Sequence, residues 1–203
     1  MQEIIAGVRT FQREVFPQYR ELFAKLAAGQ RPEALVITCS DSRVDPFLFT
    51  NAQPGQLFVL RNAGNLVPKY DGLIGGVTAT IEFAVVGLKV PNIIVCGHAG
   101  CGAIHGLLHP ESLGDMPHVA NWLEHHAEPV REALARAGSL DGPDVMHKAV
   151  DANVLVQLDN LRHHPCVAEG LAAGTLKLHG WVYDFVNGEI RAYDESGQRF
   201  TAI

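Results

Sequence analysis

Apolar residues recur along this chain in two patterns, which predict helices and strands in alternation. Residues 2–27 repeat apolar positions every three or four residues, interrupted only at Pro17, which predicts one or two amphipathic helices ahead of a sheet. Three short runs, at 34–39, 56–62 and 92–98, are rich in Val, Ile and Leu without polar alternation, as in parallel strands covered on both faces. Residues 75–88 are apolar and long enough for a crossover helix between the second and third strands.

The last third of the chain predicts helices over 146–162 and 165–173, followed by strands over 176–186 and 189–193. The Asn187-Gly188 pair between those strands predicts a tight hairpin whose two turn residues both adopt positive φ. We therefore predict an α/β fold, a mainly parallel β-sheet flanked by helices with an antiparallel edge strand. The pattern indicates a single domain over residues 1–203, with 1–27 as an N-terminal helical arm.

The amino-acid composition limits the classes of function that this chain can have. Hydrophobic residues make up 47% of the 203 positions and charged residues 19%, as in soluble globular proteins. The formal net charge is −6 and Lys and Arg form no block, which argues against nucleic-acid or anionic-membrane binding and favours a small-molecule substrate. No apolar run is long enough for a targeting or membrane segment, so we expect a cytoplasmic protein.

The candidate chemistry lies at the ends of two predicted strands. Cys39 ends the first predicted strand, His98 ends the strand at 92–98, and Cys101 follows three residues later. If these strands are neighbours, the three side chains converge at the carboxyl edge of the sheet. Two thiolates and an imidazole are good zinc ligands, and three protein ligands leave the fourth tetrahedral position for water. A single Cys at a strand end is more often a buried apolar residue, so the prediction rests on their joint occurrence.

Asp41 and Arg43 lie in the turn after Cys39. Alone, they suggest a local ion pair that orders the turn. Next to a metal, a carboxylate paired with a guanidinium stays ionised and can accept a proton from a reacting group. Four cysteines at uneven spacing do not predict a disulfide framework. Cys96 lies within its strand and should point away from the side bearing His98 unless the strand breaks there, so it is interpreted as a core residue, as is Cys166 after Pro165.

Two of these segments together resemble a known family. Cys-Ser-Asp-Ser-Arg at 39–43 and His-Ala-Gly-Cys-Gly at 98–102 resemble the paired signature of β-carbonic anhydrases, and the similarity extends over roughly residues 28–194. The resemblance implies one Zn²⁺ per chain and reversible hydration of carbon dioxide to bicarbonate and a proton, by attack of zinc-bound hydroxide on CO₂. It also implies that the N-terminal helices extend to a second subunit, in a homodimer or a dimer-based higher oligomer.

The resemblance assigns roles to individual residues. It implies zinc ligation by Cys39, His98 and Cys101, with the catalytic Asp41–Arg43 dyad beside the metal. The chain is similar to the plant-like branch of the family, which implies a substrate pocket formed by Gln30, Phe58, Phe83 and the backbone amide of Gly102. One departure is Ala99, where the family usually has Ser or Thr, because Ala removes a possible hydroxyl partner for the ligands.

Three alternatives remain open from the sequence. The same scaffold can host a hydrolase of carbon disulfide or carbonyl sulfide. A non-catalytic zinc module would have Asp41 as a permanent fourth ligand. A redox function of Cys96 and Cys101 is the weakest, since no Cys-x-x-Cys occurs.

Overall fold

The computed structural model describes residues 1–72, 75–136 and 144–203. It divides into two compact units, Met1–Arg31 and Pro32–Ile203, and each is described by itself.

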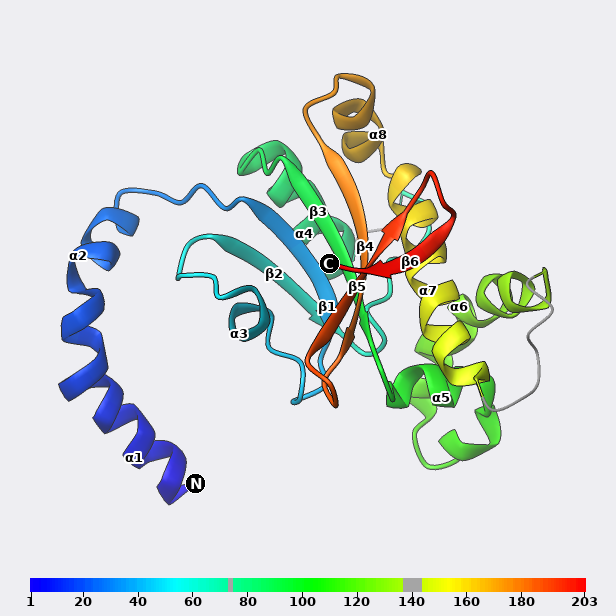
Figure 1. Ribbon diagram of the computed structural model, residues 1–203, viewed down its shortest axis with the longest axis horizontal. Helices are drawn as coiled ribbons and strands as arrows, with labels where there is room; N and C mark the ends of the chain where they lie inside the picture. Colours follow the sequence, from blue (N-terminus) through cyan, green and yellow to red (C-terminus); the bar gives the residue numbers. More distant parts are fainter. Residues whose placement is uncertain (73–74, 137–143) are drawn as a thin grey trace. The chain divides into compact units, whose positions relative to one another are not determined.

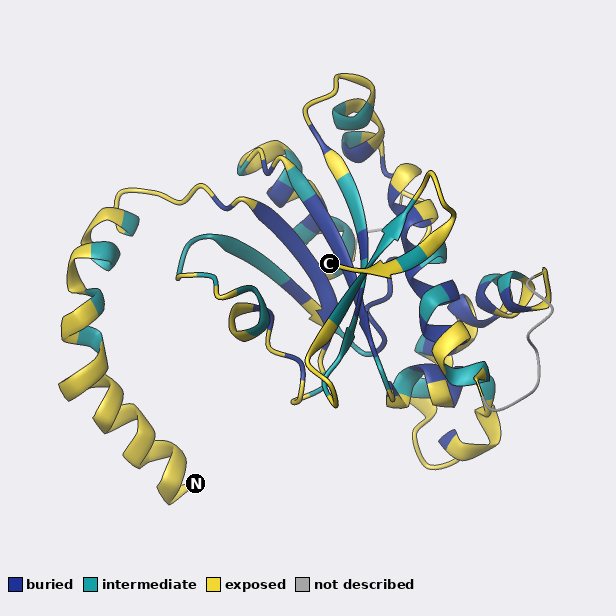
Figure 2. Cartoon of the chain, viewed as in Figure 1, coloured by how far each residue is buried: buried dark blue, intermediate teal, exposed yellow. Residues whose placement is uncertain are grey.

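The first unit is helical, as the pattern of residues 2–27 predicts. It comprises α1 (Gln2–Thr10), a π-helical turn η1 (Phe11–Val15) and α2 (Phe16–Leu26). Pro17 lies in the first turn of α2, where its missing N–H and fixed φ are tolerated, so the helix continues past it. The apolar side chains of α1 and η1 are exposed within this unit, as the yellow segment of Figure 2 shows; they include Ile4, Ile5, Val8, Phe11 and Val15.

The second unit is built on one sheet of six strands in the order β2-β1-β3-β4-β5-β6 (Figure 1). The strands are β1 (Ala34–Cys39), β2 (Leu57–Asn62), β3 (Asn92–His98), β4 (Lys177–Asp184), β5 (Glu189–Asp194) and β6 (Arg199–Ala202). The first four strands of the sheet order pair in parallel, and β5 and β6 add antiparallel pairs. The predicted parallel sheet with an antiparallel edge is therefore confirmed.

The described helices of this unit include several that the sequence pattern did not predict. Those expected are α4 (Gly76–Glu82) with its π-helical extension η2 (Phe83–Gly87), α7 (Val145–Arg162) and α8 (Pro165–Ala172). Those not expected are α3 (Pro46–Thr50), α5 (Gly102–Leu108), the 3₁₀ turn η3 (Pro110–Leu113) and α6 (Pro117–Arg136). Polar residues along α6, with His125 exposed and His126 buried, and the internal Pro129 obscure a helix that still buries Leu123, Val130 and Leu134.

The core lies on both faces of the sheet, as expected of parallel strands. On one face, Leu35, Ile37, Ile93 and Val95 belong to the main core cluster, which also includes Val150, Val154, Leu158 and Leu161 of α7. The opposite face carries a smaller cluster of Ala34, Val36, Ile94 and Cys96, packed against Phe49, Leu57, Trp181 and Tyr183. Every residue of β1 is buried, because both faces are covered (Figure 2).

The predicted hairpin exists, but its turn is longer than expected. Asp184 pairs with Glu189, so four residues separate the paired positions, and of Asn187 and Gly188 only Gly188 adopts a positive φ, 72°. The prediction of a two-residue turn was wrong because the Asp184 side chain accepts hydrogen bonds from the Val186 N–H and the Asn187 amide, which stabilises the wider loop. The sequence pattern also missed β6, a short strand that is largely exposed.

Close packing of α7 on the sheet depends on two glycines. A Cβ at Gly97 would lie 2.9 Å from methyl groups of Val150 and Val154, and a Cβ at Gly180 would lie 2.9 Å from Val154 and Leu158. Carbon atoms do not approach this closely, so an added methyl group would force the contacting side chains or the helix to move.

We predict that Gly180→Ala lowers the free energy of unfolding by about 1–3 kcal/mol, the usual cost of overpacking a filled core. Denaturant unfolding monitored by circular dichroism measures this change. Gly76→Ala is the control: a Cβ there meets no atom within 4 Å, and Ala favours the helix, so the variant should be as stable as the parent or slightly more so. Equal stability of the two variants would contradict the packing argument.

Candidate active site

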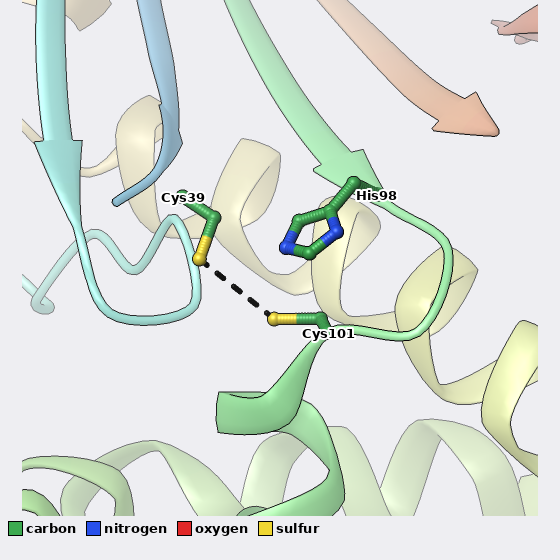
Figure 3. Close-up of side chains that lie close together, drawn as sticks. All are labelled: Cys39, His98 and Cys101. Carbon is green, nitrogen blue, oxygen red and sulfur yellow. Dashed lines mark hydrogen bonds between the residues drawn. The ribbon is translucent and has the colours of Figure 1, made fainter. Parts of the chain in front are cut away.

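Three buried side chains converge at the carboxyl edge of the sheet. Cys39 ends β1, His98 ends β3, and Cys101 immediately precedes α5 (Figure 3). Their ligand atoms all lie within 4.8 Å of one another, and the two sulfurs are 3.9 Å apart. The strand adjacency on which this juxtaposition depends is present, because β1 pairs directly with β3.

The imidazole of His98 is held in one tautomer. Its Nδ1 lies 2.9 Å from the carbonyl oxygen of Ala99, which can only accept a hydrogen bond, so Nδ1 carries the hydrogen. The unprotonated Nε2 is buried and has no hydrogen-bond partner among the described residues. A buried nitrogen lone pair directed at two sulfurs is the arrangement of a metal ligand. Ala99 has no side-chain hydroxyl to orient the ligand, but its backbone carbonyl orients His98 instead.

The two thiols differ in how easily they lose a proton, because they share a hydrogen bond. Hydrogen bonding with the Cys101 thiol lowers the pKa of Cys39 to about 4, and the backbone N–H of Gly64 contributes in the same direction, 3.5 Å from the Cys39 sulfur. Cys101 is the partner that retains the proton, and its pKa is raised by the interaction with Cys39 and by burial. A site that stabilises thiolate at Cys39 is suited to a cation.

Asp41 and Arg43 form a bidentate ion pair next to this cluster. Arg43 donates from Nε to Oδ1 of Asp41 at 2.9 Å and from Nη2 to Oδ2 at 2.7 Å, and its backbone N–H also donates to Oδ1 at 2.9 Å. These bonds hold the pKa of Asp41 well below its usual range, so the carboxylate stays ionised. Its Oδ2 lies 3.9 Å from Nε2 of His98.

Arg61 holds the backbone of the segment that carries Cys39 and Asp41, a role that sequence reasoning missed. Its guanidinium donates to three carbonyl oxygens, those of Cys39 at 3.0 Å, Asp41 at 2.7 Å and Val44 at 2.8 Å. One planar side chain on β2 therefore fixes the turn that leaves β1. An Arg at the end of a strand gives no sequence signal for this role, because the acceptors are backbone groups.

A row of buried amides on α7 holds the loop that approaches Cys39. Asn153 donates to the Gly64 carbonyl at 3.1 Å, Gln157 accepts from the Val67 N–H at 2.8 Å, and Asn160 donates to the Val67 carbonyl at 2.8 Å. These residues are spaced three or four positions apart and so lie on one face of the helix. Polar residues at core positions of a helix pattern were the available signal, and the sequence reasoning did not use it.

The expected substrate residues lie in three places. The rings of Phe58 on β2 and Phe83 on η2 approach to a centroid distance of 5.9 Å, and Phe83 is 53% exposed. Gly102 is the first residue of α5, where backbone N–H groups lack intrahelical partners. Gln30 is exposed and belongs to the first unit, so the structure does not relate it to the other three.

The donor set fits a zinc ion. Two sulfurs and one imidazole nitrogen are favoured zinc donors, and the buried Nε2 without a described partner is explained by a metal. The other two cysteines do not join the cluster. Cys96 is fully buried on the far face of the sheet and Cys166 packs against the main core, as the sequence predicts. Burial raises the pKa of Cys96 to about 12, and all four cysteines are free thiols, which disfavours the redox alternative.

Comparison with known proteins places the chain in a family. A family model described as carbonic anhydrase matches residues 34–190. The carbonic anhydrase of Pseudomonas aeruginosa is 48% identical over 209 residues, covering 100% of this chain and 92% of the relative. That of Synechocystis is 46% identical, covering 96% of this chain and 71% of the relative. The chain belongs to the carbonic anhydrase family.

Solved structures identify the class within that family. The β-carbonic anhydrase CcaA superposes with a TM-score of 0.94 at 45% identity, covering 100% of this chain and 99% of that one. A Coccomyxa β-carbonic anhydrase in complex with acetazolamide superposes with a TM-score of 0.80 at 34% identity, covering 94% of this chain and 84% of that one. The chain is a carbonic anhydrase of the β class, a family of zinc enzymes that hydrate carbon dioxide. Across residues 1–72, 75–136 and 144–203, no helix has the length and hydropathy of a membrane span.

We predict that Arg61→Gln lowers carbon dioxide hydration by about tenfold or more, because the turn carrying Cys39 and Asp41 loses its backbone anchors. The free energy of unfolding should fall by about 1–3 kcal/mol. Arg162→Gln is the control, since Arg162 forms an exposed ion pair with Glu195 and such pairs contribute about 0–1 kcal/mol. Stopped-flow assay and denaturant unfolding test both, and parent-like turnover in Arg61→Gln would contradict the anchoring role.

Proposed function

We propose that Cys39, His98 and Cys101 hold one Zn²⁺ per chain and that the chain catalyses reversible hydration of carbon dioxide to bicarbonate and a proton. The observation that carries the proposal is the buried Cys39–His98–Cys101 cluster, with the Nε2 of His98 unpartnered among the described residues and directed at two sulfurs. Three protein ligands leave a tetrahedral ion one open position. When bound there, Zn²⁺ would supply Lewis-acid chemistry, which lowers the pKa of water.

The groups that contact the three metal-ligand residues orient them and take no part in the reaction itself. The Ala99 carbonyl fixes the His98 ring, and the Gly64 N–H together with the helix start after Cys101 stabilises negative charge on sulfur. All three ligand residues are buried, so bulk water has little access to the cluster. Restricted access strengthens each electrostatic interaction in the site.

Asp41 acts as a hydrogen-bond acceptor for the attacking nucleophile. An ionised carboxylate can only accept, so it selects the orientation in which the nucleophile donates its hydrogen to Oδ2 and turns a lone pair toward carbon dioxide. Arg43 maintains this role in two ways, by keeping Asp41 ionised and by occupying both carboxylate oxygens. The same pairing disfavours the alternative of a closed, non-catalytic site in which Asp41 is a permanent metal ligand.

The resemblance supplies the substrate side of the proposal, which combines apolar and polar groups. We assign carbon dioxide contacts to Phe58 and Phe83, whose rings contact each other, and a hydrogen bond to the Gly102 backbone amide at the start of α5. Gln30 is the polar residue that the resemblance adds to this set. An apolar pocket with few polar groups suits a small neutral molecule such as CO₂. Turnover of carbon disulfide and carbonyl sulfide, measured beside that of CO₂, distinguishes the related hydrolase activity.

The metal assignment predicts a stoichiometry. Purified protein should contain about one zinc per chain, and Cys39→Ser and His98→Ala should lose zinc together with CO₂ hydration, because two ligands hold the ion much less tightly than three. Elemental analysis and stopped-flow hydration measure both properties. Cys166→Ser, which alters a half-buried thiol outside the cluster, should retain both. Full zinc content in both ligand variants would rule out the assignment.

The dyad makes a separate prediction. Arg43→Ala should retain zinc, because Arg43 is no ligand, and should reduce kcat by about a hundredfold, because Asp41 loses its two-point anchor and moves relative to the nucleophile. Zinc content and steady-state hydration are measured on the same preparation. Parent-like turnover would mean that the ion pair only orders the turn.

We further propose that the chain forms a homodimer or a dimer-based oligomer through the arm, residues 1–27. The support is the set of exposed apolar side chains on α1 and η1, together with the tetrameric state named for two Sordaria macrospora β-carbonic anhydrases, one of which is 33% identical with a TM-score of 0.73. The cytoplasmic location stays a prediction.

The arm proposal is tested by mass in solution. Light scattering of the intact chain should give a multiple of 22.0 kDa, and Phe11→Glu should shift the mass toward the monomer, because it places a charge on the exposed apolar surface. Arg13→Glu, on the same turn but already polar, is the control. A monomeric parent, or a Phe11→Glu variant with unchanged mass at micromolar concentration, would contradict the proposal.

A further inference from the structure

Phe185 covers the dyad from the hairpin, although no motif in the sequence connects the two. The ring lies under the Arg43 guanidinium, with 4.3 Å between the ring centroid and Cζ. It also approaches the metal-ligand loop, since its centroid is 6.1 Å from that of His98 and its Cζ lies 3.9 Å from where a Cβ on Gly100 would be. One half-buried aromatic residue therefore contacts both segments that form the site.

The position of Phe185 is fixed by the turn that follows β4. The Asp184 carboxylate accepts from the Val186 N–H at 2.9 Å and from the Asn187 amide at 3.1 Å, and the Asp184 carbonyl accepts from the Gly188 N–H at 2.8 Å. On the other side, the Ala99 N–H donates to the Tyr183 carbonyl at 2.9 Å, which ties the ligand loop to the same strand. The ring is thus held against the loop by bonds on both sides of it.

Arg43 needs such support because its other contacts leave it open to water. Its side chain is 50% exposed, whereas that of Asp41 is 16% exposed. Beyond Asp41, it donates only a longer hydrogen bond to the Gly100 carbonyl, at 3.3 Å, among the described residues. Exposed ion pairs are weak when water competes for both partners, and a ring stacked on the guanidinium excludes water from one face.

We propose that Phe185 is a positioning residue for the hydration reaction, which holds the Arg43 guanidinium on Asp41 through a cation–π contact and so keeps the carboxylate oriented. The inference rests on the proposed roles of the metal ligands and of the dyad. It assigns to the β4–β5 hairpin a part in catalysis that reaches the reaction through Arg43 and not through substrate.

The first test compares two substitutions that each replace an aromatic ring with leucine. Phe185→Leu keeps the apolar volume but removes the aromatic face, and it should lower kcat about tenfold, the order expected from loss of a partly desolvated cation–π contact. KM for carbon dioxide should stay within about twofold, because substrate contacts are intact. Phe200→Leu is the control: the Phe200 ring also contacts an arginine, with 5.4 Å between its centroid and Cζ of Arg191, and this substitution should leave kcat unchanged.

The second test separates stacking from packing. Phenylalanine analogues with increasing ring fluorination, incorporated at 185, keep the shape of the ring but weaken its negative face, so kcat should fall stepwise with each added fluorine. In an Arg43→Ala background, Phe185→Leu should cause no further loss, because its effect passes through Arg43. Equal kcat across the fluorinated series, or full additivity with Arg43→Ala, would overturn the inference.

Different results would refute the proposed function and the proposed role of Phe185. A parent protein without zinc, or without carbon dioxide hydration, refutes the proposed function itself. A parent with one zinc and normal turnover, whose Phe185→Leu variant matches it in kcat, refutes only the role of Phe185. Zinc content is measured for every variant and should remain about one per chain in Phe185→Leu, since the ligands are untouched.

Discussion

The site depends on the direct pairing of β1 with β3. Thr38 lies opposite Cys96 in the parallel register, so Cys39, one residue further along β1, and His98, two residues further along β3, emerge at the same edge of the sheet. Residues separated by more than fifty positions in the sequence become neighbours through the pairing of these two strands. The dyad, the ligand loop and the hairpin are then arranged around this one pair of strand ends.

Charge is the second constraint on this edge. In the proposed site, two thiolates would balance a divalent zinc ion, so a third anion in contact with the metal would make the centre negative and a poorer Lewis acid. Asp41 nevertheless lies within reach of it, with Oδ2 at 3.9 Å from the ligand nitrogen of His98. The Arg43 guanidinium compensates the extra charge outside the ligand set. The site can thereby contain a carboxylate as a hydrogen-bond acceptor without adding it to the ligands.

Sequence reasoning predicted the parts of the fold that local pattern determines. Apolar runs without alternation marked β1 and β3 with their observed bounds, and the polar residues directly after them marked the ligand cluster that the structure brings together. Sequence reasoning did not predict features that depend on contacts between distant residues or on side-chain caps. The turn at Asn187-Gly188 was misjudged because a side-chain cap from Asp184 outweighs the preference of the dipeptide. Arg61 and the α7 amides bind backbone groups, which carry no residue identity, so a sequence cannot indicate their partners.

The two glycines under α7 show that the thickness of the helix layer governs the chemistry at the sheet edge. Because Gly97 and Gly180 present bare backbone to the helix, α7 lies close enough for Asn153 and Gln157 to reach the loop at 64–67. That loop positions the Gly64 N–H beside the Cys39 sulfur. The spacing between α7 and the sheet therefore determines the electrostatic environment of a proposed metal ligand. A single methyl group added at Gly97 or Gly180, far from solvent, would change the stability of the Cys39 thiolate.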